Sequence, residues 1–323
     1  MNAGRAFGLG WRVFRALPGA AGRGIFVAVA VAAWLAHGSG VRQLEANLAR
    51  LRPGAGRREI RRLALAGMKS YMRYYCEAFQ LPALRADQID ARVRGVGQER
   101  VQAEIEAGRS VVIALTHCGN WDLAGAWATR NLGRIVTVAE RLRPEELFRE
   151  FLAFRESLGM TVIPFEPGAG VFRRLITEAR SDAVSIPLLA DRDLSAGGVD
   201  VVLAGHRMRA ASGPAALSLA ASLPLFPAGL YYERLHGKRR RAAGSPWGLV
   251  VDFGEPVAPP EGVPRELVVA ELTQAWVGVV EKTILAHAED WHMLQKVFVD
   301  DLDPQRPAGA SSAAARALAE GSA

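Results

Sequence analysis

The strongest constraint on the fold of this sequence is an alternation of short apolar runs and helix-like segments that begins near residue 88. Apolar runs of about four to eight residues are typical of strands, and longer segments with helical periodicity lie between them. This alternation favours an α/β fold with a mostly parallel central sheet flanked by helices. The predicted strands are Val93–Val96, Val111–Thr116, Ile135–Ala139, Thr161–Phe165 and Ala183–Ala190, and the predicted helices are Gln98–Glu106, Trp121–Leu132, Pro144–Leu158 and Val171–Ala179.

After Asp193 the pattern becomes less regular. A glycine-containing loop at 195–198 is followed by a strand at Val199–Leu203 and a basic segment at 206–209. A small-residue helix, two strands and a long helix are then predicted at Gly213–Ala221, Leu225–Tyr232, Gly248–Phe253 and Arg265–His287, with the basic run 238–241 in an exposed hairpin or loop between the two strands.

The first 85 residues are predicted to form a basic helical lobe. Residues 1–73 contain 13 Lys and Arg against two acids, which is +11 in a chain whose net charge is +7. Such a basic end implies an anionic surface as partner, and without repeated aromatic residues it does not resemble a nucleic-acid platform. The predicted helices are Arg5–Leu17, Ala20–Leu35, Val41–Leu51 and Arg57–Phe79.

One segment of this lobe, Gly24–Ala36, has 13 uncharged residues and is shorter than the roughly 20 that a membrane span needs. It is consistent with a helix that lies in the membrane interface or with an ordinary buried helix. A secretory signal is disfavoured, because small residues are poorly spaced for cleavage after Leu35.

The length and composition allow one large core, since the chain has 323 residues and is 50% hydrophobic. We expect a membrane-docking lobe (1–85), an α/β domain (86–303) and an Ala/Ser/Gly-rich tail (304–323) that is predicted to be disordered. Two cysteines cannot form a disulfide framework and neither has zinc-site spacing, so a reducing compartment is expected.

The run Val111–Leu115 ends at His117, and Asp122 follows in the first turn of the next predicted helix. An imidazole can accept a proton near neutral pH, and a carboxylate on its other nitrogen would fix the tautomer. An ordinary strand-end histidine followed by a helix-capping acid explains the same spacing equally well. Cys118 is predicted to be a buried thiol, because neighbouring residues at a strand end point in different directions.

Other polar residues follow predicted strands. Asp191 follows the run Val184–Leu189, and Glu140 ends the strand that begins at Ile135. Ligands collect at the carboxyl ends of parallel strands, so Asp191 could face His117. Arg155, on the helix after Glu140, could hold a phosphate or pair with Glu140, although such arginines are usually solvated.

The sequence lacks the phosphate loop G-x-x-x-x-G-K-[ST], the dinucleotide motif G-x-G-x-x-G, the nucleophile elbow G-x-S-x-G and the zinc motif H-E-x-x-H. Kinase, dehydrogenase, serine hydrolase and zinc protease functions therefore have no support.

Three segments together resemble one family. They are T-H-C-G-N-W-D (116–122), A-D-R-D-L-S (190–195) and D-W-H-M-L-Q-K-V-F (290–298). They resemble the lipid A lauroyl/myristoyl and phosphatidylinositol mannoside acyltransferases, within the lysophospholipid-acyltransferase-like superfamily. The resemblance extends from the basic lobe to about residue 302.

The resemblance implies transfer of an acyl chain from acyl-CoA, as co-substrate, to a mannose hydroxyl of a phosphatidylinositol mannoside. The reaction would need neither a metal nor another cofactor, and would occur at the cytosolic face of the plasma membrane on a peripheral or monotopic protein. His117 corresponds to the family's general base and Asp122 to the motif acid. Asp191 stands where the family often has the longer Glu that partners the histidine.

Glu140 and Arg155 correspond to polar residues of the family's donor site. Arg192 in the second motif and Gly197 in the loop after it complete the candidate substrate-binding residues. Val202, Leu203 and Ala204 replace aromatic residues that the family often has, so the acyl groove is expected to differ in shape. An acyl-CoA thioesterase or lipid hydrolase, acylation of a different glycolipid, and a non-catalytic membrane-binding protein remain as alternatives.

Overall fold

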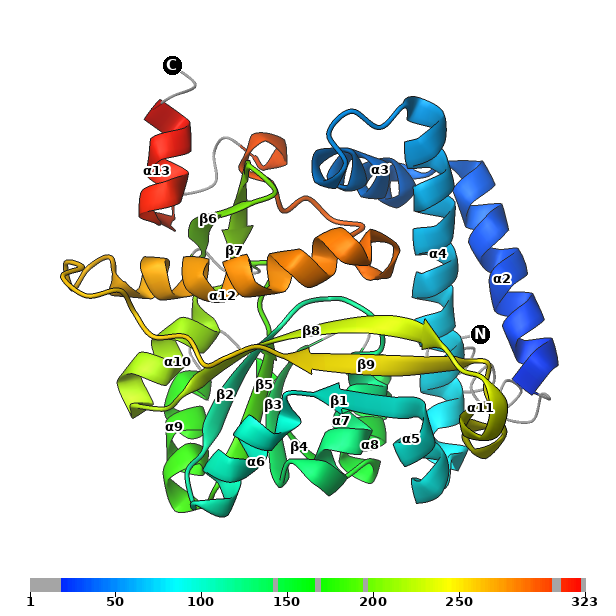
Figure 1. The fold of residues 1–323 in the computed structure, drawn as a ribbon, viewed down its shortest axis with the longest axis horizontal. Helices are drawn as coiled ribbons and strands as arrows, with labels where there is room; N and C mark the ends of the chain where they lie inside the picture. The colour runs from blue at the N-terminus through cyan, green and yellow to red at the C-terminus, as the bar shows by residue number, and fades with distance from the viewer. Residues whose placement is uncertain (1–18, 142–144, 166–169, 194–196, 304–308, 321–323) are drawn as a thin grey trace.

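The structure is a computed structural model that describes residues 19–141, 145–165, 170–193, 197–303 and 309–320. Its centre is a seven-stranded sheet of order β1-β9-β8-β2-β5-β3-β4 (Figure 1). β8 and β9 are antiparallel, and the other neighbouring strands of this sheet are parallel. The strands are β1 Val93–Val96, β2 Val111–Leu115, β3 Arg134–Glu140, β4 Met160–Phe165, β5 Val184–Leu189, β8 Leu225–Arg234 and β9 Trp247–Phe253.

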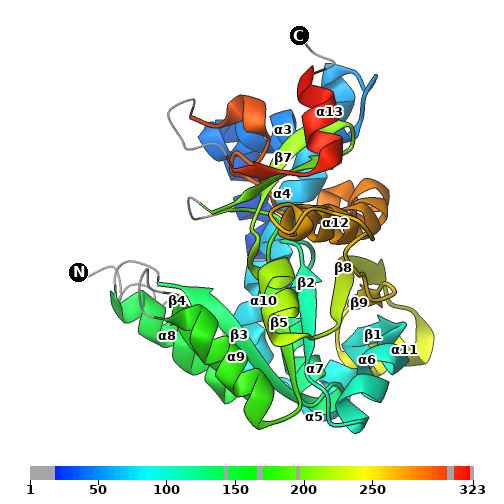
Figure 2. The same cartoon turned by 90° about the vertical axis from the view of Figure 1, so that its left-hand side faces the viewer.

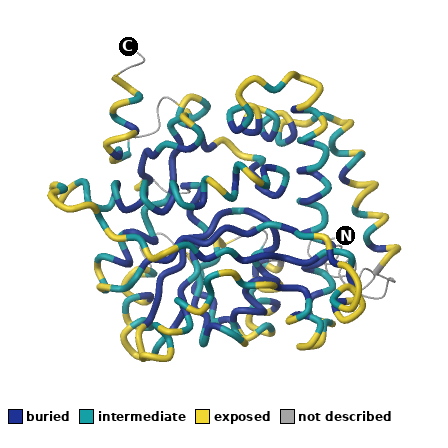
Figure 3. The backbone as a smooth tube through the Cα atoms, viewed as in Figure 1, coloured by how far each residue is buried: buried dark blue, intermediate teal, exposed yellow. Residues whose placement is uncertain are grey.

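The middle of this sheet is the core of the molecule. All five residues of β2 are buried, and β5 beside it is buried along most of its length (Figure 3). A strand covered on both faces needs apolar residues at successive positions, which explains the uninterrupted run V-V-I-A-L. The predicted α/β class with a mostly parallel sheet flanked by helices is confirmed.

Helices flank the sheet, and α4 stands beside it with α2 packed along its length (Figure 1). The strands and helices predicted between residues 93 and 193 form with small differences at their ends. The predicted helix Arg5–Leu17, Pro144 and part of the 195–198 loop lie outside the described residues. The helices are α2 Gly19–Ala36, α3 Ser39–Leu51, α4 Arg57–Gln80, α5 Ala86–Arg92, α6 Gln98–Glu106, α7 Trp121–Asn131, α8 Glu145–Ser157, α9 Val171–Ser181, α10 Gly213–Ala221, α11 Gly237–Ala243, α12 Val268–Ala286 and α13 Ala313–Glu320.

A second, three-stranded sheet lies above the main one in Figure 2. β6 (Val199–Leu203) pairs antiparallel with β7 (His206–Ala210), so the basic segment at 206–209 is a strand. Ala204 and Gly205, between the two strands, have φ values of +52° and +76°. Positive φ at both central residues is the requirement of the type I′ two-residue hairpin turn. Gly205 is a typical residue for such a turn, but Ala204 is not, so the sequence did not predict the hairpin.

The basic run 238–241 forms helix α11, so its prediction as a hairpin or loop is wrong. Arg239 Nε donates to the carbonyl of Ala91 at 2.8 Å, and Arg92 Nε donates to the carbonyl of Ala243 at 3.0 Å. These contacts hold both ends of α11 against α5, and Arg, Lys and Ala are good helix formers.

The C-terminal residues 310–320 also differ from the prediction of a disordered tail. β10 (Ala310–Ser311) pairs parallel with β6, and the N–H of Ser312 donates to the carbonyl of Asp200 at 3.0 Å. Ser312 Oγ then accepts from the N–H of Ala315, which is buried. The Ala-rich composition that indicated disorder is equally suited to a helix once a sheet edge is available. The division into domains stays a prediction.

Helix α2 presents apolar side chains to solvent. Phe26 packs on Phe79 of α4, with ring centroids 5.9 Å apart, while other positions of α2 leave large apolar residues exposed. They are Ile25, Val27, Val29 and Leu35. No single helix among the described residues is long and apolar enough to cross a membrane. The helix pair Ala20–Ala36 and Ser39–Leu51, bent by 85°, is together long and apolar enough to span a membrane, judged by length and composition alone.

Candidate active site

The turn between β2 and α7 carries His117. β2 ends at Leu115, and Asn120 caps α7 by accepting a hydrogen bond from the N–H of Leu123 at 2.9 Å. Gly119, between them, has φ +58°, and an added Cβ would lie 2.9 Å from Leu249 Cδ1. Both demands favour glycine at this position of the tight turn.

The register of the sheet places Asp191 opposite His117. Leu115 of β2 pairs with Leu189 of β5, and each candidate residue lies two positions beyond its strand's last residue. Asp191 Oδ1 lies 2.5 Å from His117 Nδ1, and Asp191 Oδ2 accepts from the backbone N–H of His117 at 2.9 Å. The shorter acid therefore reaches the imidazole directly.

The Asp191 carboxylate is held in its ionised form. It is 1% exposed, and its Oδ2 also accepts from Trp291 Nε1 at 2.8 Å. Burial by itself raises the pKa of Asp191, but the charge of His117 and the hydrogen bonds from His117 and Trp291 outweigh burial and lower it. An ionised acceptor at Nδ1 requires that nitrogen to carry the proton, which leaves His117 Nε2 as a basic nitrogen.

Asp122, the other acid of the motif, does not share this contact. Its Oδ2 accepts from the hydroxyl of Tyr74 at 2.7 Å, and its Oδ1 pairs with Arg155 Nε at 2.8 Å. All hydrogen bonds described for its carboxylate go to these two residues. The buried Asp122 carboxylate thus contacts Arg155 and Tyr74, and among the described hydrogen bonds none joins it to His117.

The remaining predicted residues divide into two groups. Glu140, Arg155 and Arg192 line the same cavity as His117, and Arg192 Nη2 lies 3.6 Å from Glu140 Oε2. The alternative in which Arg155 pairs with Glu140 is wrong, because Arg155 pairs with Asp122. Gly197 is exposed and does not line this cavity; its carbonyl accepts from Ser212 Oγ at 3.0 Å.

The cavity beside His117 has a volume of about 330 Å³ and combines aromatic walls with charged groups. Two of its buried donors, Trp121 Nε1 and Arg192 Nε, have no hydrogen-bond partner among the described residues. Aromatic faces with unpaired polar atoms suit a ligand that has both apolar faces and hydroxyl groups. Its lining includes Tyr71, Tyr74, Tyr75, Trp121, Phe148, Phe151, Leu152, His292 and Gln295.

A smaller, mostly apolar cavity of about 80 Å³ lies between α7 and the sheet. It shares Trp121 and Arg155 with the first cavity and is bounded by alternate residues of several strands. They include Ile113 and Leu115 of β2, Ile135 and Thr137 of β3, Pro187 and Leu189 of β5, and Val251 and Phe253 of β9.

Sequence reasoning missed three residues of this site. Tyr74 comes from α4, in the lobe predicted only for docking, while Trp291 and His292 follow α12. The spacing of tyrosines on α4 and the D-W-H segment were the available signals. Neither indicated which other element these side chains would meet.

Cys118 is buried, as predicted. Burial first, and then the negative charge of Asp191, raise the pKa of the Cys118 thiol well above its usual value. A thiol in this setting stays protonated, so it is not an activated nucleophile.

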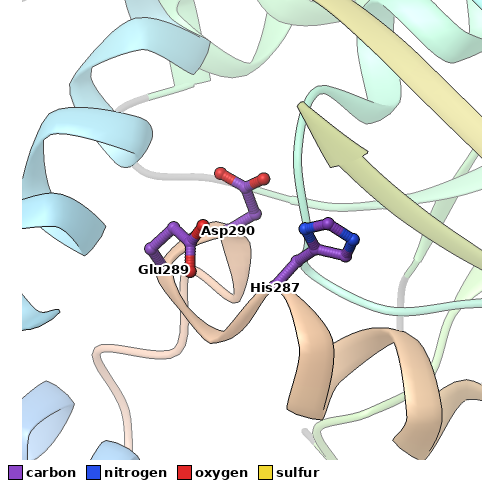
Figure 4. A group of neighbouring side chains, drawn as sticks. All are labelled: His287, Glu289 and Asp290. Atoms are coloured by element: carbon purple, nitrogen blue, oxygen red, sulfur yellow. The ribbon is translucent and has the colours of Figure 1, made fainter. Parts of the chain in front are cut away.

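A separate group of His287, Glu289 and Asp290 lies in the turn after α12 (Figure 4), with potential ligand atoms within 4.8 Å of one another. The two Asp290 oxygens already accept from Ser70 Oγ and from the N–H of Tyr232, at 2.5 and 2.8 Å. These bonds tie the turn to α4 and β8, so we assign Asp290 to the packing of this turn.

Comparison with known proteins finds one matching family and several similar proteins. Residues 6–299 match the family model described as bacterial lipid A biosynthesis acyltransferase. A phosphatidylinositol mannoside acyltransferase of Mycolicibacterium smegmatis is 36% identical over 304 residues, covering 94% of this chain and 93% of that protein. The protein of the same name from Mycobacterium tuberculosis H37Rv is 36% identical over 307 residues, covering 94% and 90%. A solved 1-acyl-sn-glycerophosphate acyltransferase of Thermotoga maritima aligns with TM-score 0.35 and 12% identity, over 82% of this chain and 96% of that one.

Proposed function

The chain belongs to the bacterial lipid A biosynthesis acyltransferase family, and from this premise we propose that it transfers a long acyl chain from acyl-CoA to a mannose hydroxyl of a phosphatidylinositol mannoside. Acyl transfer to a glycolipid is the activity that the family and the two mycobacterial relatives support. The donor, the mannose hydroxyl and the base are our proposal.

The observation that carries the proposal is the contact between the buried Asp191 carboxylate and the partly exposed His117 at the wall of the larger cavity. His117 Nε2 removes the proton from the sugar hydroxyl as its oxygen attacks the thioester carbonyl. The new C–O bond forms, the C–S bond breaks, and the protonated His117 returns the proton to the departing CoA thiolate. Asp191 stabilises the imidazolium while it exists.

The two cavities suit the two halves of this reaction. The larger one has the aromatic walls and polar atoms that a sugar ring requires, and the smaller one has an apolar lining suited to the first carbons of an acyl chain. Since they share Trp121 and Arg155, a thioester carbonyl near His117 can have its acyl chain directed under α7. The unpaired N–H groups of Trp121 and Arg192 are candidate donors to the oxyanion.

We also propose that the protein works at an anionic membrane surface, on the cytosolic side. The exposed apolar side of α2 and the exposed arginines at the start of α4 support this location. Apolar burial combined with electrostatic attraction is how interfacial helices bind such membranes.

The test uses purified protein with palmitoyl-CoA, with and without phosphatidylinositol mannoside in mixed vesicles. CoA release and the acylated glycolipid are measured together, the latter by mass spectrometry. CoA release that depends on the glycolipid and equals product formation supports acyl transfer. Equal release without glycolipid indicates a thioesterase, and neither consumption nor binding of the donor indicates a non-catalytic protein.

His117→Ala should lower transfer roughly a hundredfold or more, the contribution of a positioned base. Cys118→Ala is the matched control, because it changes the neighbouring buried residue and leaves the base in place. A His117→Ala protein with near-normal transfer would rule out His117 as the base. Lipids from a strain lacking the gene identify the acceptor by the acyl form that disappears.

A further inference from the structure

His292 is held beside the candidate base. Its backbone N–H donates to the carbonyl of His117 at 2.8 Å, and its ring is among the groups that line the larger cavity. The ring centroid lies 5.3 Å from that of Tyr71 and 6.3 Å from that of Trp121. The residue is 4% exposed, so its polar atoms cannot rely on solvent.

A hydrogen-bond chain sets the tautomer of this ring. Ser70 Oγ donates to Asp290 Oδ1 at 2.5 Å, and Asp290 Oδ2 accepts from the N–H of Tyr232. Burial raises the pKa of Asp290, while the hydrogen bonds from Ser70 and Tyr232 favour its charged, accepting form. With its one proton given to Asp290, Ser70 accepts in its second contact, with His292 Nε2 at 2.9 Å. His292 therefore carries its proton on Nε2, and Nδ1 presents a lone pair.

That lone pair is unused within the protein. His292 Nδ1 is buried and has no hydrogen-bond partner among the described residues. Burial, and then the charges of Arg73 and His117, lower the pKa of His292 to about 3. The ring is thus neutral at physiological pH, and Nδ1 remains an acceptor. A buried acceptor without a partner is unfavourable unless a ligand supplies the donor.

We infer that His292 Nδ1 accepts a hydrogen bond from a second hydroxyl of the acceptor sugar, adjacent to the one that His117 deprotonates. This assignment rests on the proposed function. A thioester group and an acyl chain offer no donor, whereas every free hydroxyl of a sugar does. Two fixed contacts, at His117 and at His292, orient the ring and select which hydroxyl is acylated.

The test combines acceptor analogues with a pair of variants. Acceptors that lack one mannose hydroxyl at a time, or carry fluorine in its place, are compared in the wild-type protein. His292→Gln can still reach Ser70 but has no acceptor at the Nδ1 position. His292→Asn places an amide oxygen near that position and loses the contact with Ser70.

In the wild-type protein, loss of one particular hydroxyl should raise the KM for the acceptor roughly tenfold, as for a buried hydrogen bond, with the KM for palmitoyl-CoA unchanged. Fluorine at that carbon should be as harmful as deletion, because it cannot donate. In His292→Gln the intact acceptor should show the raised KM, and deletion of the same hydroxyl should add nothing. His292→Asn should keep the wild-type dependence on that hydroxyl.

Two results would overturn the inference. If removal of each mannose hydroxyl raises the acceptor KM by the same factor in the wild-type protein and in His292→Gln, no hydroxyl contacts this nitrogen. A fluorinated acceptor that binds as well as the hydroxyl form would show that Nδ1 donates rather than accepts. If the wild-type protein acylates none of the mannosides, the proposed function itself fails, and this assignment fails with it.

Discussion

Replacing Asp191 by Asn tests the proposed base most directly, because it removes the charge and keeps the shape. The amide oxygen can take the position of Oδ2 and still accept from the N–H of His117 and from Trp291. The amide nitrogen then occupies the position of Oδ1, 2.5 Å from His117 Nδ1. Two donors cannot face each other, so His117 must become protonated on Nε2 instead of Nδ1.

This tautomer lacks a basic Nε2 toward the cavity. In serine proteases the equivalent replacement lowers turnover about ten-thousandfold, because the histidine adopts the wrong tautomer. We expect Asp191→Asn to lower kcat by about a thousandfold to ten-thousandfold and to change the KM for acceptor little. The fold should survive, since two of the three hydrogen bonds at this buried position persist.

The assay is single-turnover transfer from palmitoyl-CoA to the mannoside, with a thermal unfolding curve for each protein. Asp191→Glu is the matched control, because it keeps the charge and adds one methylene. It should retain far more activity than Asn. An Asp191→Asn protein that folds and keeps a tenth or more of the wild-type kcat would refute the argument that this carboxylate sets the tautomer of His117.

Three further predictions concern stability and membrane binding. Asp122→Asn removes the counter-charge of Arg155, whose side chain is 18% exposed, so urea unfolding should show a loss of up to about 3 kcal/mol. The same change at Asp90, in an exposed ion pair, should cost at most about 1 kcal/mol. The pKa of His292, about 3 in the folded protein, is about 6.5 in an unfolded chain. As pH falls from 6.5 toward 3, only the unfolded state binds this proton. The free energy of unfolding of the wild-type protein should therefore fall by up to about 1.4 kcal/mol per pH unit relative to that of His292→Asn. Plots of unfolding free energy against pH that run parallel for the two proteins would contradict this. Three exposed arginines of α4 are Arg57, Arg58 and Arg62. Replacing them by Gln should weaken sedimentation with anionic vesicles, most at low salt. Unchanged sedimentation would show that these arginines do not bind the membrane.

The choice of these arginines depends on the structure. In the sequence, Arg61 belongs to the same basic run. In the structure its guanidinium pairs with Glu45 Oε1 at 2.8 Å and lies 4.1 Å from the ring of Trp34. Its removal would disturb the packing of α2, α3 and α4 together, which would obscure any effect on lipid binding.

Local patterns were sufficient to predict the strand end that carries His117. The apolar run of β2, the tight turn at Gly119 and the cap at Asn120 are all short-range features. The carboxyl ends of parallel strands share one edge, which is why Asp191 could be expected near His117. Which strand neighbours β2 is decided by the topology of the whole sheet, and it does not follow from these runs alone.

The rest of the site depends on long-range packing that propensity does not encode. Tyr74 reaches Asp122 across 48 residues of sequence, and Trp291 reaches Asp191 across 100. A helix can be predicted from its periodicity, but its partner depends on how several elements bury their apolar faces together. The lobe predicted for docking therefore also forms a wall of the cavity, through α4.

The two acids near His117 differ because their surroundings differ. In the proposed mechanism Asp191 contacts an imidazole that gains a proton, so the negative charge of Asp191 stabilises the transition state more than the ground state. Asp122 contacts Arg155, which stays charged at every step of the reaction. Burial lowers the pKa of Arg155, but the charge of Asp122 more than offsets this effect and raises the pKa. Loss of Asp191 should therefore appear mainly in kcat. Loss of Asp122 should appear mainly in stability and in the KM of whichever substrate Arg155 contacts, because the position of Arg155 in the cavity wall depends on that pair.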